Sequence, residues 1–356
     1  SLLVEFESGK LDRNWLDRLA AELARMIGRG QQPVVVSSGA IALGRKYLDL
    51  DTDQRRLEQQ QAAAAAGQVL LAHAYQESLG RHGAKVGQML LTLGDTEDRR
   101  RYLNARSTLE TLLQVGVVPI INENDSVATE EIRYGDNDRL AARVAAMCSA
   151  ECLVLLSDVD GLYESDPTVD PHAALIPLVE RITPELEARA GSSKTDYGSG
   201  GMRTKLAAAR ICMSAGCATV IANGNDPAVL SEVGRGARCT WFLPGTTPQL
   251  ARKRWIAGAL EPRGSLVIDN GAESSLLKGR SLLAVGITKV DGTFERGDAV
   301  VIRNEAGHDL ARGLVAYTSD ETRQIIGKRS EEIEAVLGYR GRDEIIHRDN
   351  LALLDS

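Results

Sequence analysis

Val118-Pro119-Ile120-Ile121-Asn122-Glu123-Asn124-Asp125 is the stretch from which the fold can be inferred, and Gly135-Asp136-Asn137-Asp138 follows it closely. An apolar, largely β-branched run ends abruptly in four polar residues, and a second acidic cluster then opens a segment with helical spacing. Ligands of open α/β sheets bind just beyond the carboxyl ends of the strands. Carboxylates and amides at such a place can hold a charged substrate or Mg²⁺. The alternative is that Asn, Asp and Gly only form turns and caps, which is their commonest role.

Outward from this stretch, buried-strand patterns alternate with helical patterns. Such alternation predicts an α/β fold with a mainly parallel sheet covered by helices on both faces. The expected strands are residues 33–36, 85–91, 117–121, 153–156 and 218–222, with a possible edge strand at 239–243. The expected helices are residues 14–30, 54–83, 99–115, 137–148 and one that includes 204–209. The alanine run 62–66 with Gly67 would let two helices approach closely, within one subunit or between two.

The pattern changes after about residue 250. A join that contains Gly and Pro leads into short strand patterns separated by turns such as Asp291-Gly292 and Arg296-Gly297-Asp298. We therefore expect a first domain over residues 1–250, a linker over 251–263 and a separate, small, β-rich domain over 264–356.

Composition narrows the classes of function. The chain has 356 residues and a net charge of −7, from 42 basic and 49 acidic residues. That balance argues against a bulk electrostatic grip on nucleic acid, and 4% aromatic residues give little support to a base-stacking surface. No apolar run reaches membrane-spanning length. Five cysteines without a CxxC pair are typical of reduced cytoplasmic thiols.

A second polar loop, residues 191–202, is rich in Gly and Ser and leads into a helical segment that carries Lys205. Glycines let backbone N–H groups approach phosphate, and a nearby lysine can neutralise developing charge. The loop is not a Walker A motif, since GxxxxGK[ST] is absent, and the chain also lacks GxGxxG, Ser-His-Asp spacing and zinc-ligand spacing. A lone lysine here would be interpreted as a surface residue; the preceding glycine loop favours phosphoryl transfer.

Several motifs in one order now match a known family. They are residues 35–42 (VVSSGAIA), 87–92 (GQMLLT), 121–125 (INEND), 135–138 (GDND) and 200–205 (GGMRTK). The chain resembles the amino-acid kinase family along its whole length, specifically the members that phosphorylate glutamate and carry a C-terminal PUA domain. The resemblance implies a three-layer αβα sandwich followed by a small β-rich PUA domain.

The resemblance also implies a reaction and its partners. The reaction is phosphorylation of the L-glutamate γ-carboxylate by ATP, the first step of proline synthesis, with Mg²⁺ held mainly by the ATP phosphates rather than by protein ligands. Proline is the expected feedback inhibitor at a site that overlaps that of glutamate. A homo-oligomer, dimer or tetramer, and a cytoplasmic location are expected. PUA domains elsewhere often bind RNA, and the sequence leaves the role of this one open.

Site residues are carried over by matching motifs. Ser38, Asp125 and Asn137 match glutamate-binding positions, and Asp125 is assigned to the amino group because it would repel a carboxylate. The positions that match ATP-binding residues are Ser157, Asp158, Ser199, Gly200, Gly201, Met202, Arg203, Thr204 and Lys205. Lys205 would stabilise the transferring phosphoryl group, and Asp138 would hold the catalytic lysines in place. The family's first strand, which ends in Lys-x-Gly-Ser/Thr, is expected to precede Ser1.

Two other hypotheses remain open. Another kinase of the same superfamily could act on aspartate, acetylglutamate or a small phosphate, although residues 122–125 and the C-terminal domain argue against this. An RNA-binding or regulatory protein could use the PUA domain and retain a degenerate kinase domain. Replacing Lys205 with Ala separates an enzyme from an RNA-binding protein, because only an enzyme would lose turnover.

Overall fold

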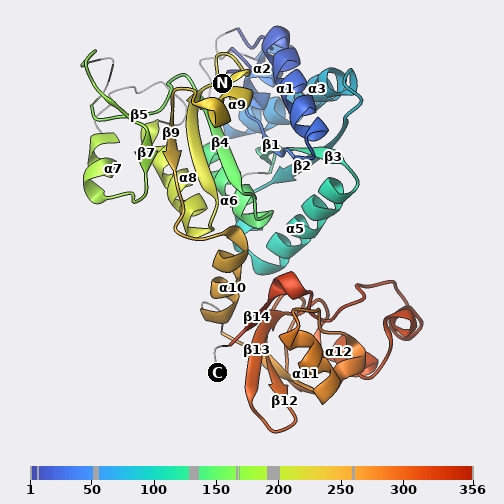
Figure 1. Ribbon diagram of the computed structural model, residues 1–356. Coiled ribbons are helices and arrows are strands. Elements are labelled where there is room, and N and C mark those ends of the chain that lie inside the picture. The colour runs from blue at the N-terminus through green and yellow to red at the C-terminus, as the bar shows by residue number, and fades with distance from the viewer. Residues whose placement is uncertain are drawn as a thin grey trace. The chain divides into compact units, whose positions relative to one another are not determined.

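The computed structural model describes residues 2–5, 8–50, 56–127, 136–165, 167, 169–190, 201–258 and 261–354. The chain divides into two compact units, Ser1–Thr247 and Pro248–Ser356 (Figure 1). Helix α10 (Pro248–Gly258) belongs to the second unit and occupies much of the stretch predicted as a linker. No helix in the described part of the chain is both long and apolar enough to cross a membrane.

The strands of the first unit form two main ladders. Their orders are β1-β3-β2 and β4-β8-β9-β7, and β5 pairs with β6 in a short antiparallel ladder. All pairs in the two main ladders are parallel except β8 with β9, so the prediction of a mainly parallel arrangement is confirmed. The strands are β1 (Val35–Val36), β2 (Lys85–Leu91), β3 (Val117–Glu123), β4 (Cys152–Ser157), β5 (Leu162–Tyr163), β6 (Leu175–Ile176), β7 (Leu178–Val179), β8 (Ala218–Asn223) and β9 (Cys239–Phe242).

The described helices of this unit connect these strands and cover them. They are α1 (Arg13–Gly28), α2 (Ala40–Tyr47), α3 (Leu57–Gly80), α4 (Leu93–Glu97), α5 (Arg99–Gln114), α6 (Asp136–Met147), α7 (Pro184–Ala190), α8 (Met202–Ser214) and α9 (Val229–Glu232). The sequence did not predict α4, α7 or the short strands β5 to β7. Their few residues carry too little hydrophobic periodicity to be recognised.

Alternating residues on the central strands face opposite helical layers. On β3, Val118 and Ile120 pack with α1 and α3, whereas Ile121 packs with α5 and α6. On β8, Ile221 packs with α6 and α8, and Val220 lies in a separate cluster beside α9. This period of two places a helical layer on each face of the strands. The expected three-layer arrangement is therefore present.

Two expectations about strand extent are wrong. β3 continues through Asn122 and Glu123, because its parallel ladder with β2 runs on to the pair Leu91–Glu123. The Asn122 side-chain amide is also satisfied there, since it donates a hydrogen bond to the buried Gln68. β9 is not an edge strand, because Leu178 and Val179 pair with its free side. That partner is only two residues long, so the sequence gives little sign of it.

Helices α2 and α3 cross at a contact made by two glycines. A Cβ at Gly67 would lie 1.8 Å from the carbonyl oxygen of Ala40, and one at Gly44 would lie 1.7 Å from that of Ala63. Neither position can carry a side chain without separating the helices. The predicted close approach at Gly67 is therefore confirmed, and it lies within one chain.

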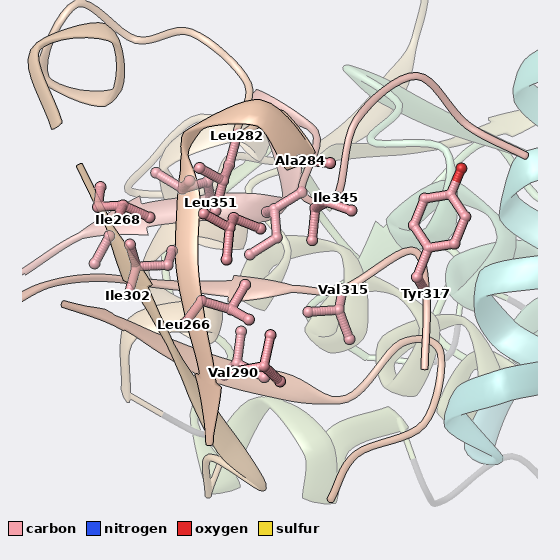
Figure 2. Packing of buried hydrophobic residues seen from close by; sticks show 14 of the residues in the cluster. Leu266, Ile268, Leu282, Ala284, Val290, Ile302, Val315, Tyr317, Ile345 and Leu351 are labelled. Carbon is pink, nitrogen blue, oxygen red and sulfur yellow. The ribbon is translucent and has the colours of Figure 1, made fainter. Parts of the chain in front are cut away.

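The second unit is built on one five-stranded sheet with the order β11-β10-β12-β13-β14. Its strands are β10 (Gly264–Ile268), β11 (Ile287–Gly292), β12 (Ala299–Asn304), β13 (Asp309–Leu314) and β14 (Leu351–Leu353). The other helices are α11 (Asn270–Leu277), α12 (Ser319–Ile325) and α13 (Ile333–Leu337). Its apolar core includes Leu266, Ile302 and Ile345, and Tyr317 lies at the end of the cluster with its hydroxyl pointing away (Figure 2). That hydroxyl donates to the Arg342 carbonyl.

Several details of this unit differ from the sequence-based expectation, which included strands over 282–290 and near Ile345. A 3₁₀ turn over Ala284–Gly286 precedes β11, and Ile346 forms only an isolated bridge to Leu282. Helix α11 was not predicted, although the Asp269 side chain caps it by accepting from the Ala272 N–H. Its eight residues show weak amphipathic spacing, so the cap was the one available signal.

Candidate active site

The carboxyl ends of β1, β3 and β2 meet at one edge of their ladder. The Ser37 N–H donates to the Ile121 carbonyl at 2.8 Å, and the Asn124 N–H donates to the Leu91 carbonyl at 2.9 Å. Ser38 comes two residues after β1 ends, and Asp125 comes two residues after β3 ends. Two of the three predicted glutamate-binding residues thus follow neighbouring strands at the same edge. Both are half-buried.

Helix α3 holds these strand ends from one face, which sequence reasoning missed. The Asn122 Nδ2 donates to Gln68 Oε1 at 2.8 Å, and the hydroxyls of Ser37 and Tyr75 lie 3.1 Å apart. Gln68 and Tyr75 are seven residues apart, two helical turns, so both project from the same face. Their Ala-rich surroundings gave no sign of these contacts.

The carboxyl ends of β4 and β8 form a second polar edge. Ser157 pairs with Asn223 in register, and the Ser157 hydroxyl donates to Asp158 Oδ1 at 3.1 Å. The Gly224 N–H donates to the Ser157 carbonyl at 2.7 Å, while its own carbonyl accepts from Trp15 Nε1. Two of the residues predicted to bind ATP, Ser157 and Asp158, therefore lie at the end of β4.

Lys205 and Asp138 form an ion pair between two helices that lie side by side (Figure 1). The Lys205 Nζ is 3.1 Å from Asp138 Oδ2, and the Thr204 hydroxyl donates to the same oxygen at 2.7 Å. The side chains of Lys205 and Asp138 are 10% and 17% exposed. A lysine this deeply placed is held by its partner, which excludes the alternative of a freely solvated surface lysine.

The N-terminus of α8 supplies the remaining described part of the phosphate loop. Gly201 precedes the helix, and Met202 and Arg203 begin it; Arg203 is exposed. Asn137 lies in the first turn of α6 beside Asp138 and is half-buried. Ser199, Gly200 and Gly135, together with the side chain of Asp136, lie outside the described residues.

The charges suit an anionic ligand near α8. An ammonium group, helix N–H groups and a glycine at the helix start can stabilise phosphate oxygens. Among the described residues, no three His, Cys, Asp or Glu side chains gather as a metal site. A metal ion that accompanies the nucleotide would find Asp138 Oδ2 already engaged by Lys205 Nζ and the Thr204 hydroxyl.

Tyr75 provides a prediction about pH. Burial raises its pKa to about 12, against a small opposing effect of the hydrogen bond with Ser37. In the unfolded chain this hydroxyl loses its proton near pH 10. The contribution of Tyr75 to folding stability is therefore fully present below about pH 10 and is lost as pH rises toward 12. We expect Tyr75→Phe to flatten this fall by up to about 1.4 kcal/mol per pH unit, measured by urea unfolding at pH 9, 10 and 11.

The matched control for that experiment is Tyr47→Phe, which alters an exposed tyrosine of α2. Its unfolding curves should follow those of the wild type at each pH. Parallel pH dependences for Tyr75→Phe and the wild type would contradict the prediction.

Comparisons with known proteins agree with this geometry. The family model "Amino acid kinase family" matches residues 3–223, and the model "PUA domain" matches residues 264–337. Carbamate kinase from Giardia lamblia bound to AMP-PNP superposes with a TM-score of 0.50 at 15% identity, over 68% of this chain and 94% of that one, which shows the shared fold alone. The first unit is thus an amino-acid kinase domain.

Curated relatives narrow the class. Glutamate 5-kinase of Paramagnetospirillum magneticum is 58% identical over 99% of this chain and 95% of its own length. Glutamate 5-kinase of Rhodospirillum rubrum is 55% identical over 99% of this chain and 94% of its own length. The chain therefore belongs to the glutamate 5-kinase group of the amino acid kinase family.

Proposed function

We propose that the protein transfers the γ-phosphoryl group of ATP to the γ-carboxylate of L-glutamate, forming L-glutamyl 5-phosphate and ADP for proline biosynthesis. The observation that carries this beyond family membership is the Lys205–Asp138 ion pair, in which the lysine at the start of α8 is buried. An RNA-binding protein with a degenerate kinase domain would have no need to keep this pair. The alternative function is not favoured.

The proposed step needs little covalent chemistry from the protein. A carboxylate oxygen of glutamate attacks the γ-phosphorus, an O–P bond forms, and the bond from phosphorus to the β,γ-bridging oxygen breaks. The bond's electron pair leaves on ADP. The nucleophile is already ionised, so no general base is required. Two anions must instead be brought together, and cations and N–H dipoles lower their repulsion.

We assign roles to the residues on this basis. Lys205 stabilises the transferring phosphoryl group, and Asp138 with Thr204 fixes the direction of its ammonium group. Ser38, Asp125 and Asn137 bind glutamate, with Asp125 on the amino group. Ser157, Asp158 and the loop that ends at Gly201 bind ATP.

Other features of the proposal rest on the family relationship. Mg²⁺ accompanies ATP and neutralises phosphate charge when bound. Proline inhibits by competing at the glutamate site, and the protein is a homo-oligomer in the cytoplasm. The proposed kinase domain spans 1–250 and the proposed PUA domain 264–356, and the proposed join 251–263 includes most of α10, which packs against β13 and β14.

The deciding assay measures ADP release from Mg-ATP with L-glutamate, L-aspartate, N-acetyl-L-glutamate and no acceptor, using the full-length protein. Turnover with glutamate alone, reduced by proline, is the expected result. Trapping the acyl phosphate with hydroxylamine identifies the product as a γ-hydroxamate. A folded protein that turns over none of the acceptors would refute the proposal and favour the RNA-binding alternative.

A further inference from the structure

Gln68 on α3 has a buried side-chain amide whose oxygen is hydrogen-bonded and whose nitrogen is not, among the described residues. The residue is 7% exposed, and its Oε1 accepts from Asn122 Nδ2. Its Nε2 is buried and finds no hydrogen-bond partner within the part of the chain that the structure describes. Buried polar groups are nearly always paired, so an unpaired donor at this place requires an explanation.

The orientation of the two amides follows from a backbone contact. Amide oxygen and nitrogen positions are assigned from their hydrogen bonds. The Glu123 N–H donates to Asn122 Oδ1 at 2.9 Å, which directs Asn122 Nδ2 toward Gln68. Gln68 must then present Oε1 to Asn122, and exchanging its two atoms would place two donors face to face. Nε2 is therefore the atom left over.

The surroundings of Gln68 belong to the amino-acid half of the site. Asn122 is the penultimate residue of β3, three residues before Asp125. Gly67, next to Gln68, packs against the Ala40 carbonyl at the start of α2, two residues after Ser38. The nucleotide residues Ser157 and Asp158 instead lie at the end of the β4 ladder.

The hydrogen-bond donors that the Gln68–Asn122 pair leaves unused determine which ligand it can bind. Both hydrogens of Gln68 Nε2 and the second hydrogen of Asn122 Nδ2 are donors, while each amide oxygen already accepts a hydrogen bond. Such a pair suits a carboxylate and offers little to an ammonium group.

We propose that Gln68 Nε2 donates a hydrogen bond to a carboxylate of the amino-acid substrate, with Asn122 holding the Gln68 amide in place. This inference rests on the proposed function and adds a specificity-determining residue to it. Asp125 and the Gln68–Asn122 pair then recognise opposite charges on one zwitterionic substrate. A water molecule on Nε2 is the competing explanation, and it predicts no selective effect on glutamate.

The test is Gln68→Glu, which keeps the acceptor for Asn122 and replaces the free donor by a carboxylate oxygen. We expect the KM for glutamate to rise by about tenfold or more at pH 8, while the KM for ATP stays unchanged. The rise should shrink as pH falls toward 6, because burial favours the protonated form of the introduced carboxyl, which can donate again. A purely structural role would not give this selective, pH-dependent change.

The matched control is Gln76→Glu, the same chemical change at an exposed position of the same helix. Equal glutamate KM values for the two variants at both pH values would overturn the inference while leaving the proposed function intact. A wild-type protein that does not use glutamate would overturn both. If Gln68→Glu does not fold, Gln68→Met replaces it: a raised KM for glutamate alone supports the inference, and an unchanged KM overturns it.

Discussion

Lys205→Ala is expected to lower kcat by about 10²- to 10³-fold while the protein folds normally, the effect of removing one preorganised group that stabilises transition-state charge. The Lys205 side chain is 10% exposed and its ammonium group lies 3.1 Å from Asp138, so solvent cannot supply an equivalent cation. The measurement is steady-state ADP release at saturating ATP and glutamate, with the thermal unfolding midpoint recorded in parallel.

Lys85→Ala serves as the control, because Lys85 is exposed at the amino end of β2, away from the carboxyl ends of the strands. Its kcat should equal that of the wild type. Near-normal turnover by Lys205→Ala would remove Lys205 from the catalytic machinery and leave the ion pair with Asp138 as a structural contact only.

Gly67→Ala is expected to destabilise the fold at the upper end of, or beyond, the roughly 1–3 kcal/mol that overpacking costs. The added Cβ would lie 1.8 Å from the Ala40 carbonyl oxygen and 2.6 Å from the Gly44 nitrogen, both backbone atoms that cannot rotate away. Helices α2 and α3 would have to separate, and α2 starts just after Ser38. We therefore also expect weaker glutamate binding in whatever folded fraction remains.

Urea unfolding of Gly67→Ala beside Gly80→Ala checks this prediction. Gly80 ends the same helix, and a Cβ there meets nothing within 4 Å. That variant should be neutral or stabilised by up to about 1 kcal/mol, because alanine favours helix. Equal stabilities for the two variants would show that the crossing of α2 and α3 adapts easily.

The sequence predicted the long elements well because their hydrophobic periodicity is strong. β2 has the predicted bounds, and α1 and α5 begin and end within two residues of the predictions. Continuous apolar strands between helices indicated the parallel ladders. The short strands β5, β6 and β7 were missed because two residues carry no period.

The sequence predicted the residues of the site that lie in motifs, but it missed those that helix α3 contributes. Asp138 and Lys205 lie in motifs with uncommon composition, and they meet in the structure through the packing of α6 on α8. Gln68 and Tyr75 reach the site from a long Ala-rich helix, and only the three-dimensional position of α3 shows which of its polar residues face the strands. Roles that depend on tertiary packing between distant segments cannot be deduced from local pattern alone.

Helix α10 determines where the C-terminal unit can be cut. Arg252 Nε donates to the Asp349 carbonyl at 3.1 Å, and Arg312 Nη1 donates to the Ala257 carbonyl at 2.7 Å. Ile256 is fully buried. A module excised at residue 264, where the PUA match starts, would lose all of these contacts and gain an exposed sheet surface. A portable version of this module, for domain exchange between relatives, has to begin at Pro248.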